Sequence, residues 1–246
     1  MSHSKPNIPK VVVISGIIGA GKTTLINLLG SRLAQEGYKI VIVKEPVEEW
    51  KSSGLLQLFY GDPVRYGYTF QTEAFRSRIM TIRKVLEENP QAELILMERS
   101  PWDDQIFMKM LYDSGKITQL EWDLYKKWCD MWELLLPVSP DLFILLNPPV
   151  GVCQTRVKVR GRPGEDMISD DYQTNLKEYH DKFFSSGGLS SSGGGPSSLE
   201  EVEETTAMIG NMLVPCYHLT TEENFKEDEA VKVKVLEIFK KIMSRH

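Results

Sequence analysis

Short apolar runs alternate along the chain with longer segments in which apolar residues recur at helical spacing. The first run consists almost wholly of β-branched residues, as expected of a strand that is buried on both faces of a parallel sheet. Five runs read as strands, namely VVVIS (11–15), KIVIV (39–43), ELILM (93–97), DLFILL (141–146) and LVPCYHL (213–219). Strands that alternate with helices predict βαβ units, so we expect an α/β fold in which helices cover both faces of a parallel sheet.

The segments between these runs carry the periodicity of amphipathic helices. After the first run, apolar residues at Leu25, Leu28, Leu29 and Leu33 predict a helix that ends near Gly37. Further helices are expected over 64–88 with a candidate break near Gly67, over 118–136, after Pro149, and over 226–245.

A stretch made almost entirely of serine and glycine, SSGGLSSSGGGPSS at 185–198, interrupts this alternation. Such a composition cannot build a packed core, so we expect a flexible surface insertion over 185–200. The strand and helix that follow are too short to form a domain alone and are expected to return to the same sheet. We therefore predict a single domain over 1–246.

Composition narrows the class of protein. The chain has 246 residues, of which 41% are hydrophobic and 26% charged, and its formal net charge is −5. A chain of this length can bury one good core. Its negative charge argues against a general nucleic-acid-binding protein, which usually carries a basic face. No apolar run approaches the roughly 18 to 20 residues that crossing a membrane requires.

The cysteines and the N-terminus indicate where the protein works. Cys129, Cys153 and Cys216 are widely spaced and odd in number, so neither a disulfide framework nor a zinc pattern is visible. MSHSKPNIPK lacks the apolar region of a signal peptide and the Arg-rich pattern of a transit peptide. We expect a cytoplasmic enzyme whose residues 1–9 form a flexible tail.

The first strand leads directly into a phosphate-loop pattern, Gly16-x4-Gly21-Lys22-Thr23, and a helix follows it, as the pattern requires. Glycines let successive backbone N–H groups point at a phosphate, and the helix N-terminus adds partial positive charge. Lysine bridges phosphate oxygens, and the threonine hydroxyl can bind Mg²⁺. The residues expected at the donor phosphates are Gly16, Gly19, Ala20, Gly21, Lys22, Thr23 and Thr24. The loop predicts a nucleoside triphosphate and Mg²⁺ but does not identify the acceptor.

Charged residues follow the next two strands of the predicted sheet. Glu45 stands at the carboxyl end of the second strand, where a carboxylate can accept a proton from an attacking hydroxyl. Glu98, at the end of the third strand, is a candidate partner of Mg²⁺ together with Thr23, and Arg99 could lie along the transferring phosphoryl group. A solvated acidic turn is the alternative for Glu45.

A cluster of arginines stands out in an otherwise acidic chain. Arg156 and Arg160 are four residues apart, hence on one face of a helix, and Arg162 follows in the next loop. The cluster suggests a lid over phosphates, which we place at 157–170. Solvated surface arginines are the alternative.

Seven segments together resemble a known family. They are GIIGAGKTT, KEPVEEW, LLQLFY, YTFQTEAFRSR, ERSPWDD, RVKVRGRP and VPCYHLTTEENF, in this order over nearly the whole chain. The chain resembles the deoxyribonucleoside kinases, which include the deoxycytidine, deoxyguanosine and mitochondrial thymidine kinases and their insect and viral relatives. The resemblance implies a P-loop kinase fold with five parallel strands, usually as a homodimer. It also implies transfer of the γ-phosphoryl group of ATP or another nucleoside triphosphate, with Mg²⁺, to the 5′-OH of a deoxynucleoside in nucleotide salvage.

The resemblance also implies roles for individual residues. Glu45 would be the general base, Lys22 and Arg99 would act on the phosphoryl group, and Gln71 would read the base edge with two hydrogen bonds. The other residues implied at the nucleoside are Trp50 and Phe70 beside the base, Tyr60 and Glu165 at the sugar 3′-OH, and Leu56, Phe59 and Tyr172. In the last segment, Glu223 and Phe225 would contact the phosphate donor.

Base specificity is implied by two further positions. Family members selective for cytosine and purines carry an Arg and an Asp where this chain has Arg78 and Asp104, and that pair crowds the place of the thymine methyl. The resemblance therefore favours deoxycytidine or purine deoxynucleosides. Because the segment between Asp104 and Phe107 is one residue shorter than usual, Asp103 and Asp104 could exchange roles.

Two other functions fit the phosphate loop. A nucleoside monophosphate kinase of the thymidylate type shares the loop and an arginine lid but typically has an Asp-Arg pair in place of Glu98-Arg99. A non-catalytic regulator that only binds nucleotides should lack at least one catalytic residue, whereas Lys22, Glu45 and Arg99 are all present.

Overall fold

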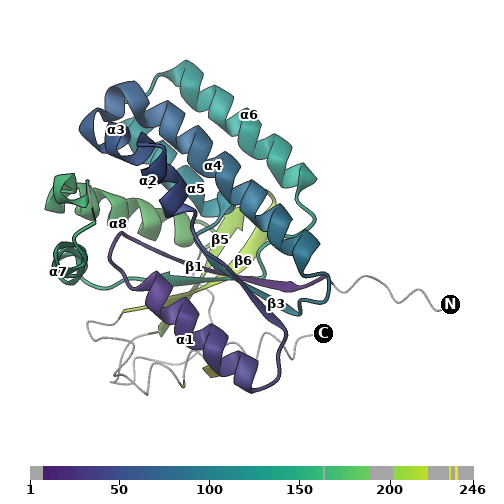
Figure 1. Ribbon diagram of the computed structural model, residues 1–246. Coiled ribbons are helices and arrows are strands. Elements are labelled where there is room, and N and C mark those ends of the chain that lie inside the picture. Colours follow the sequence, from purple (N-terminus) through teal and green to yellow (C-terminus); the bar gives the residue numbers. More distant parts are fainter. Residues whose placement is uncertain (1–7, 163, 189–201, 221–232, 234–235, 238–246) are drawn as a thin grey trace.

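The computed structural model describes residues 8–162, 164–188, 202–220, 233 and 236–237 (Figure 1). Most of the predicted Ser/Gly-rich insertion, most of the predicted C-terminal helix, and Glu223 and Phe225 lie outside the described residues. So do the first seven residues of the predicted tail.

Within the described residues the sheet has six strands in the order β2-β3-β1-β4-β6-β5. Their bounds are β1 Lys10–Gly16, β2 Ile40–Val43, β3 Leu94–Glu98, β4 Leu142–Leu146, β5 Val202–Ile209 and β6 Met212–Leu219. Strand β1 pairs in parallel with β3 and β4, β2 with β3, and β4 with β6. The predicted α/β fold with helices on a parallel sheet is confirmed.

The predicted count of five strands is wrong by one, because β5 pairs antiparallel with β6 at the edge of the sheet. Its residues alternate between buried Thr205, Ala207 and Ile209 and more exposed neighbours, which is the pattern of an edge strand. Gly210, with φ 54°, makes the tight turn into β6. The acidic residues ahead of this strand and the adjoining Ser/Gly stretch concealed the alternation.

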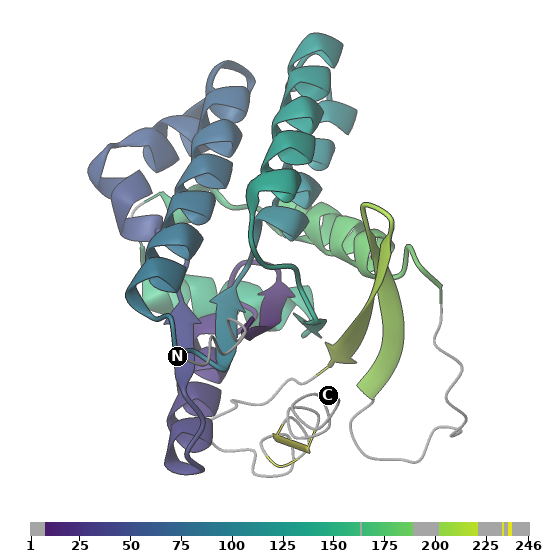
Figure 2. The ribbon, with the colours of Figure 1, turned by 90° about the vertical axis from the view of Figure 1, so that its right-hand side faces the viewer.

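The helices form a layer on each face of the sheet. Their bounds are α1 Lys22–Gln35, α2 Val47–Ser52, α3 Leu55–Gly61, α4 Pro63–Glu88, α5 Pro101–Asp113, α6 Gln119–Leu135, α7 Val150–Arg160, the short 3-10 helix η1 Glu165–Met167 and α8 Asp170–Phe184. Helix α1 lies on one face, and α4, α5 and α8 lie on the other, with α6 packed outside α4 and α5 (Figures 1 and 2). None of the helices in the described part of the chain combines the length and the apolar character needed to cross a membrane.

Helix α4 runs without interruption through Gly67, so the prediction of one long helix is confirmed and the candidate break is absent. Asp62 caps its start by accepting a hydrogen bond from the Arg65 backbone N–H, with Pro63 in the first turn. A Cβ at Gly67 would lie 3.3 Å from Leu111 Cδ1. The glycine therefore serves the close approach of α4 to α5.

The core explains why the first strand is so apolar. Val11, Val12, Val13 and Ile14 are all 0% exposed, because β1 is flanked by β3 and β4 and covered on both faces. The carboxyl ends of β1, β2 and β3 lead into the phosphate loop, Glu45 and Glu98-Arg99. These segments therefore meet at one edge of the sheet.

Candidate active site

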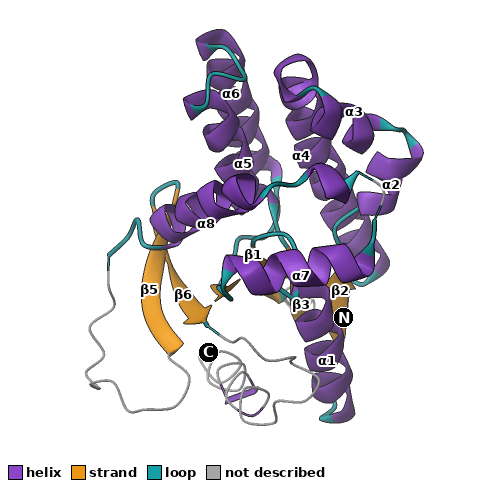
Figure 3. Cartoon of the chain, turned by 90° about the vertical axis from the view of Figure 1, so that its left-hand side faces the viewer, coloured by secondary structure: helices purple, strands orange, loops and turns teal. Residues whose placement is uncertain are grey.

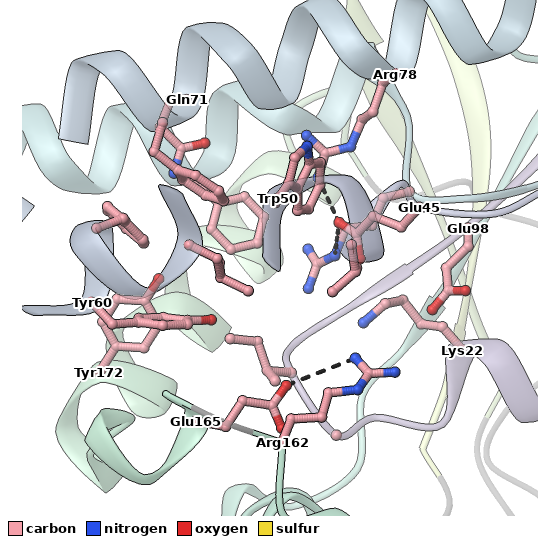
Figure 4. Close-up of a pocket in the computed structure, with 18 of the residues that line it drawn as sticks. Lys22, Glu45, Trp50, Tyr60, Gln71, Arg78, Glu98, Arg162, Glu165 and Tyr172 are labelled. Carbon is pink, nitrogen blue, oxygen red and sulfur yellow. Dashed lines mark hydrogen bonds and ion pairs between the residues drawn. The ribbon is translucent and has the colours of Figure 1, made fainter. Parts of the chain in front are cut away.

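A pocket opens at this edge, between the phosphate loop, helices α2 to α4 and the connection from α7 to α8 (Figure 4). Gln71 and Tyr60 lie at one end of it, and Lys22 and Glu98 lie at the other (Figure 4). Every residue predicted to contact the nucleoside lines the pocket except Asp104, which is buried against Arg78. Ile18, Val47 and Phe107 also line the pocket and were not predicted.

The phosphate loop needs glycine for two separate reasons. Gly16, Gly19 and Gly21 have φ values of 139°, 86° and 102°, which side chains rarely allow. In addition, a Cβ at Gly16 would lie 2.5 Å from the Leu146 carbonyl oxygen, and one at Gly19 would lie 2.4 Å from that of Cys153. The loop is thus fitted closely between β4 and α7, which lies across it (Figure 3).

Lys22 lies in the loop with its ammonium group facing backbone oxygens. Its Nζ donates hydrogen bonds to the carbonyl oxygens of Gly16 and Ile17, both at 3.0 Å. Burial lowers the pKa of Lys22 to about 7, and the nearby positive charge of Arg99 acts in the same direction. A polyphosphate bound here would supply the negative charge that restores the ammonium form.

Side chains from two other helices hold the loop from outside. Gln173 on α8 donates from Nε2 to the Ile18 carbonyl oxygen at 2.6 Å, and Arg156 on α7 donates from Nη1 to the Ala20 carbonyl oxygen at 3.3 Å. Of the predicted lid arginines, Arg160 and Arg162 line the pocket, whereas Arg156 reaches the phosphate loop. Gln173 was missed because its partner is distant in the sequence.

Thr23 and Glu98 form the candidate metal position. The Thr23 hydroxyl donates to Glu98 Oε1 at 2.6 Å, which joins the start of α1 to the end of β3. Among the described residues, no three or more His, Cys, Asp or Glu side chains gather in a group that could hold a metal ion. One hydroxyl and one carboxylate are donors that fit Mg²⁺, which is usually bound through one or two side-chain oxygens together with water and substrate phosphates.

Glu45 is held by two arginines. Arg78 Nη2 lies 2.5 Å from Glu45 Oε1, and Arg99 Nε lies 3.4 Å from the same oxygen. Burial alone would raise the pKa of Glu45, but Arg99, Arg78 and Lys22 together bring it below its ordinary value. Glu45 is therefore an ionised carboxylate at neutral pH.

Arg99 is fixed in an unusual backbone conformation. Its φ of 55° is the only positive value of any non-glycine residue in the described part of the chain. Such outliers concentrate at functional sites. The guanidinium lies 4.5 Å from the centre of the Phe107 ring, and its Nη1 lies 3.5 Å from Nε2 of buried His180. His180 was not predicted, because nothing in its local sequence signals this contact.

Aromatic rings form the walls at the other end of the pocket, and the space that they enclose is called the aromatic slot. Phe70 stacks on Phe59 with centroids 4.6 Å apart and meets Trp50 edge-on at 5.4 Å. Trp50 is fixed by a hydrogen bond from its Nε1 to Ser77 Oγ at 2.9 Å. Gln71 is buried in the same turn of α4 and faces the pocket (Figure 4). A flat ring that can hydrogen-bond at its edge fits this environment.

Two tyrosines and a glutamate line the same pocket next to the aromatic slot. Glu165 accepts hydrogen bonds from Arg160 Nη2 at 2.6 Å and from Arg160 Nε at 3.1 Å. Arg162 Nη1 lies 3.8 Å from Glu165 Oε1. Burial raises the pKa of Tyr60, and it raises that of Tyr172 to about 12. Both phenols are therefore protonated and can donate a hydrogen bond to a polar group in the pocket.

Arg78 also forms a buried ion pair with Asp104 through Nη1 and Oδ1. Asp103 serves a different purpose, since it accepts from the Ser100 backbone N–H at 2.7 Å and from Ser15 Oγ at 2.5 Å. Ser100 and Asp103 are the capping box of α5. Asp104, and not Asp103, is thus the partner of Arg78, which decides between the two arrangements that the sequence left open.

Comparison with known proteins gives consistent matches. The sequence model of the deoxynucleoside kinase family matches residues 12–244. The chain is similar to a probable deoxycytidine kinase of fowlpox virus, with 36% identity over 177 residues covering 72% of each chain. It is similar to human deoxycytidine kinase, with 28% identity over 253 residues, 93% of this chain and 90% of the human one. A mitochondrial deoxyguanosine kinase of Xenopus laevis is 26% identical over 94% of this chain and 88% of its own.

Proposed function

Because the chain belongs to the deoxynucleoside kinase family, it is a phosphotransferase that acts on deoxynucleosides, and we propose that it phosphorylates the 5′-OH with ATP as donor. The observation that carries this proposal is that one pocket contains the phosphate-loop Lys22, the ionised Glu45 and the aromatic slot around Gln71. A donor phosphate, a proton acceptor and a planar base can therefore be brought together in it.

Glu45 is the proposed general base. An ionised carboxylate beside the phosphate loop can accept the proton of the attacking hydroxyl, and Arg99 can stabilise negative charge on the phosphoryl oxygens. The lowered pKa of Glu45 makes it a weak base, which is adequate because phosphoryl transfer depends mainly on positioning and electrostatic stabilisation.

The donor end fits a triphosphate with Mg²⁺. Gly16 and Gly19 let the loop pack closely against β4 and α7, and Lys22 at the start of α1 directs its ammonium group at the loop. Backbone N–H groups of such a loop and the start of the following helix are a favourable site for phosphate oxygens. Thr23 and Glu98 would hold Mg²⁺ and its waters, and the ion would supply charge neutralisation at the phosphates. Arg160 and Arg162 would close over the donor as the lid.

We propose deoxycytidine or a purine deoxynucleoside as the preferred acceptor. The Arg78–Asp104 pair is buried next to the base slot, and a pair of this kind disfavours the thymine methyl. Gln71 would read the base edge, while Tyr60 and Glu165 would hold the sugar 3′-OH. Small molecules, and not nucleic acids, are the proposed partners, and the cytoplasm is the proposed compartment.

We also propose that the protein acts as a homodimer. Helix α6 exposes apolar residues at the spacing of one helix face, namely Leu120, Leu124, Trp128, Met131, Leu134 and Leu135. A continuous apolar face of this kind is typical of an interface between subunits. Light scattering after gel filtration should give twice the mass of the chain, and Leu124→Glu should halve it, while Val159→Glu on exposed α7 should not.

A substrate panel tests the proposed function. The measurement is kcat/KM with ATP and Mg²⁺ for the four deoxynucleosides and their 5′-monophosphates. We expect turnover of deoxynucleosides, with deoxycytidine or a purine deoxynucleoside ahead of thymidine. Turnover of monophosphates alone would instead indicate a nucleoside monophosphate kinase, and nucleotide binding without any turnover would indicate a regulator.

A further inference from the structure

A tyrosine outside the pocket is linked to the base slot by a chain of buried polar contacts. Tyr125 on α6 is 1% exposed, and its hydroxyl donates to Asp104 Oδ2 at 2.7 Å. The other carboxylate oxygen of Asp104 pairs with Arg78, which lines the pocket. We propose that Tyr125 is a positioning residue that sets base selectivity by keeping the Asp104 carboxylate aimed at Arg78. This inference rests on the proposed function, since it takes Arg78 and Asp104 to border the base.

The position of Arg78 depends on which of its contacts dominates. Its guanidinium lies 4.9 Å from the centre of the Trp50 ring and is shared between the carboxylates of Glu45 and Asp104. Glu45 follows β2 near Lys22, whereas Asp104 lies on α5 and accepts a hydrogen bond from Tyr125 of α6. When Asp104 loses its negative charge, its ion pair with Arg78 weakens. Arg78 can then shift toward Glu45, which relieves the crowding beside the base.

The Tyr125 hydroxyl matters because the ionisation of Asp104 is finely balanced. Burial raises the pKa of Asp104 to about 6, against the opposing effects of Arg78 on α4 and of the hydrogen bond from Tyr125 on α6. Asp103 on α5 and Glu45 after β2 raise it further. Tyr125 stays protonated, because burial, Asp104 and the neighbouring Cys129 raise its own pKa.

Removal of the Tyr125 hydroxyl should favour the protonated, neutral form of Asp104. Tyr125→Phe keeps the ring, which meets Phe75 edge-on and stacks on Trp122. It removes only a hydrogen bond to a charged group, which is expected to raise the pKa of Asp104 by about one unit. At pH 7 the neutral fraction of Asp104 would then rise from about a tenth to about a half, about five-fold.

The experiment compares Tyr125→Phe with a matched control. Tyr179→Phe removes an equivalent hydrogen bond of 2.7 Å, from Tyr179 to Asp113, on an exposed surface between α8 and α5. The measurement is the ratio of kcat/KM for deoxycytidine over thymidine between pH 5.5 and 9. This ratio cancels titrations that affect both nucleosides alike, such as those of Glu45 and Lys22.

In the wild type and in Tyr179→Phe, we expect the ratio to fall as the pH drops through about 6. In Tyr125→Phe the fall should occur about one pH unit higher. At pH 7 the ionised fraction of Asp104 is then about a half instead of about nine-tenths, so the ratio should be about two-fold below wild type at pH 7 and equal to it at pH 9. Coincident profiles for all three proteins would overturn the inference. An equal loss of selectivity at every pH would also overturn it, because that result indicates a packing defect.

A second readout separates this inference from the proposed function. The titration of Asp104 can be followed by ¹³C NMR of protein labelled at the aspartate carboxyl carbon, with assignment from Asp104→Asn. An Asp104 pKa that is the same in wild type and Tyr125→Phe overturns the inference even if the enzyme phosphorylates deoxynucleosides as proposed. A wild-type protein that phosphorylates no deoxynucleoside overturns the proposed function itself, whatever the NMR titration gives.

Discussion

Arg99 Nε lies 3.4 Å from Glu45 Oε1, so the strained residue after β3 and the carboxylate after β2 form one charged unit at the edge of the sheet. Backbone pairing fixes the position of Arg99, since its N–H donates to the Ile14 carbonyl oxygen of β1 at 3.0 Å. The sheet itself therefore aligns the proposed base with the group proposed to stabilise charge. Local sequence alone does not reveal this alignment.

The role of Glu45 is tested by Glu45→Gln. We expect kcat to fall by roughly 10² to 10⁴, the usual contribution of general-base catalysis, because the amide cannot accept the proton of the hydroxyl. ATP binding, measured by calorimetry, should persist. Glu48→Gln is the matched control, since Glu48 lies in the same segment but its exposed side chain pairs with Lys51 at the surface. Full turnover by Glu45→Gln would remove Glu45 from the mechanism.

Base selectivity is tested by replacing the buried ion pair as a unit. In Arg78→Ala/Asp104→Ala, thymidine turnover should rise relative to deoxycytidine by about 10-fold or more, because the charged groups beside the base are gone. The ratio of kcat/KM for the two nucleosides checks this, and an unchanged ratio would contradict it. Arg78→Ala alone should lower the unfolding temperature more than the double substitution, because it leaves the buried Asp104 without its arginine.

Gly19 of the phosphate loop can be compared with Gly37, which follows α1 and has a similar backbone conformation. Gly19 and Gly37 have φ values of 86° and 94°, but a Cβ at Gly19 would meet the Cys153 carbonyl at 2.4 Å, whereas a Cβ at Gly37 would meet nothing within 4 Å. Gly37→Ala should therefore lower the free energy of unfolding by about 1 to 2 kcal/mol and leave kcat/KM unchanged. Gly19→Ala should lower it further and weaken ATP binding. Equal effects of both substitutions on ATP binding would contradict the fit of the loop against α7.

The residues that could be predicted share a simple property: each lies in a short segment at a strand end or in a motif. Glu45 follows β2 and Glu98 ends β3, so a parallel sheet is enough to place both at the same edge. Gln173 and Tyr125 could not be predicted, because each acts on a residue that only tertiary packing brings near. The partner of Gln173, Ile18, is 155 positions away. Strand β5 was missed for a related reason, since its partner β6 defines it as an edge strand.

Lys22 predicts how stability depends on pH in the absence of nucleotide. Its folded pKa is about 7 against an ordinary 10.5, so between these values the unfolded chain binds a proton that the folded chain does not. Stability contributed by this residue therefore rises with pH across that window, at up to about 1.4 kcal/mol per pH unit. Lys22→Met should lack the rise, so the difference in free energy of unfolding between the two proteins should change between pH 7 and 9. Parallel curves from urea denaturation over this range would contradict the prediction. Added ATP should reduce the dependence, because the phosphates favour the charged lysine.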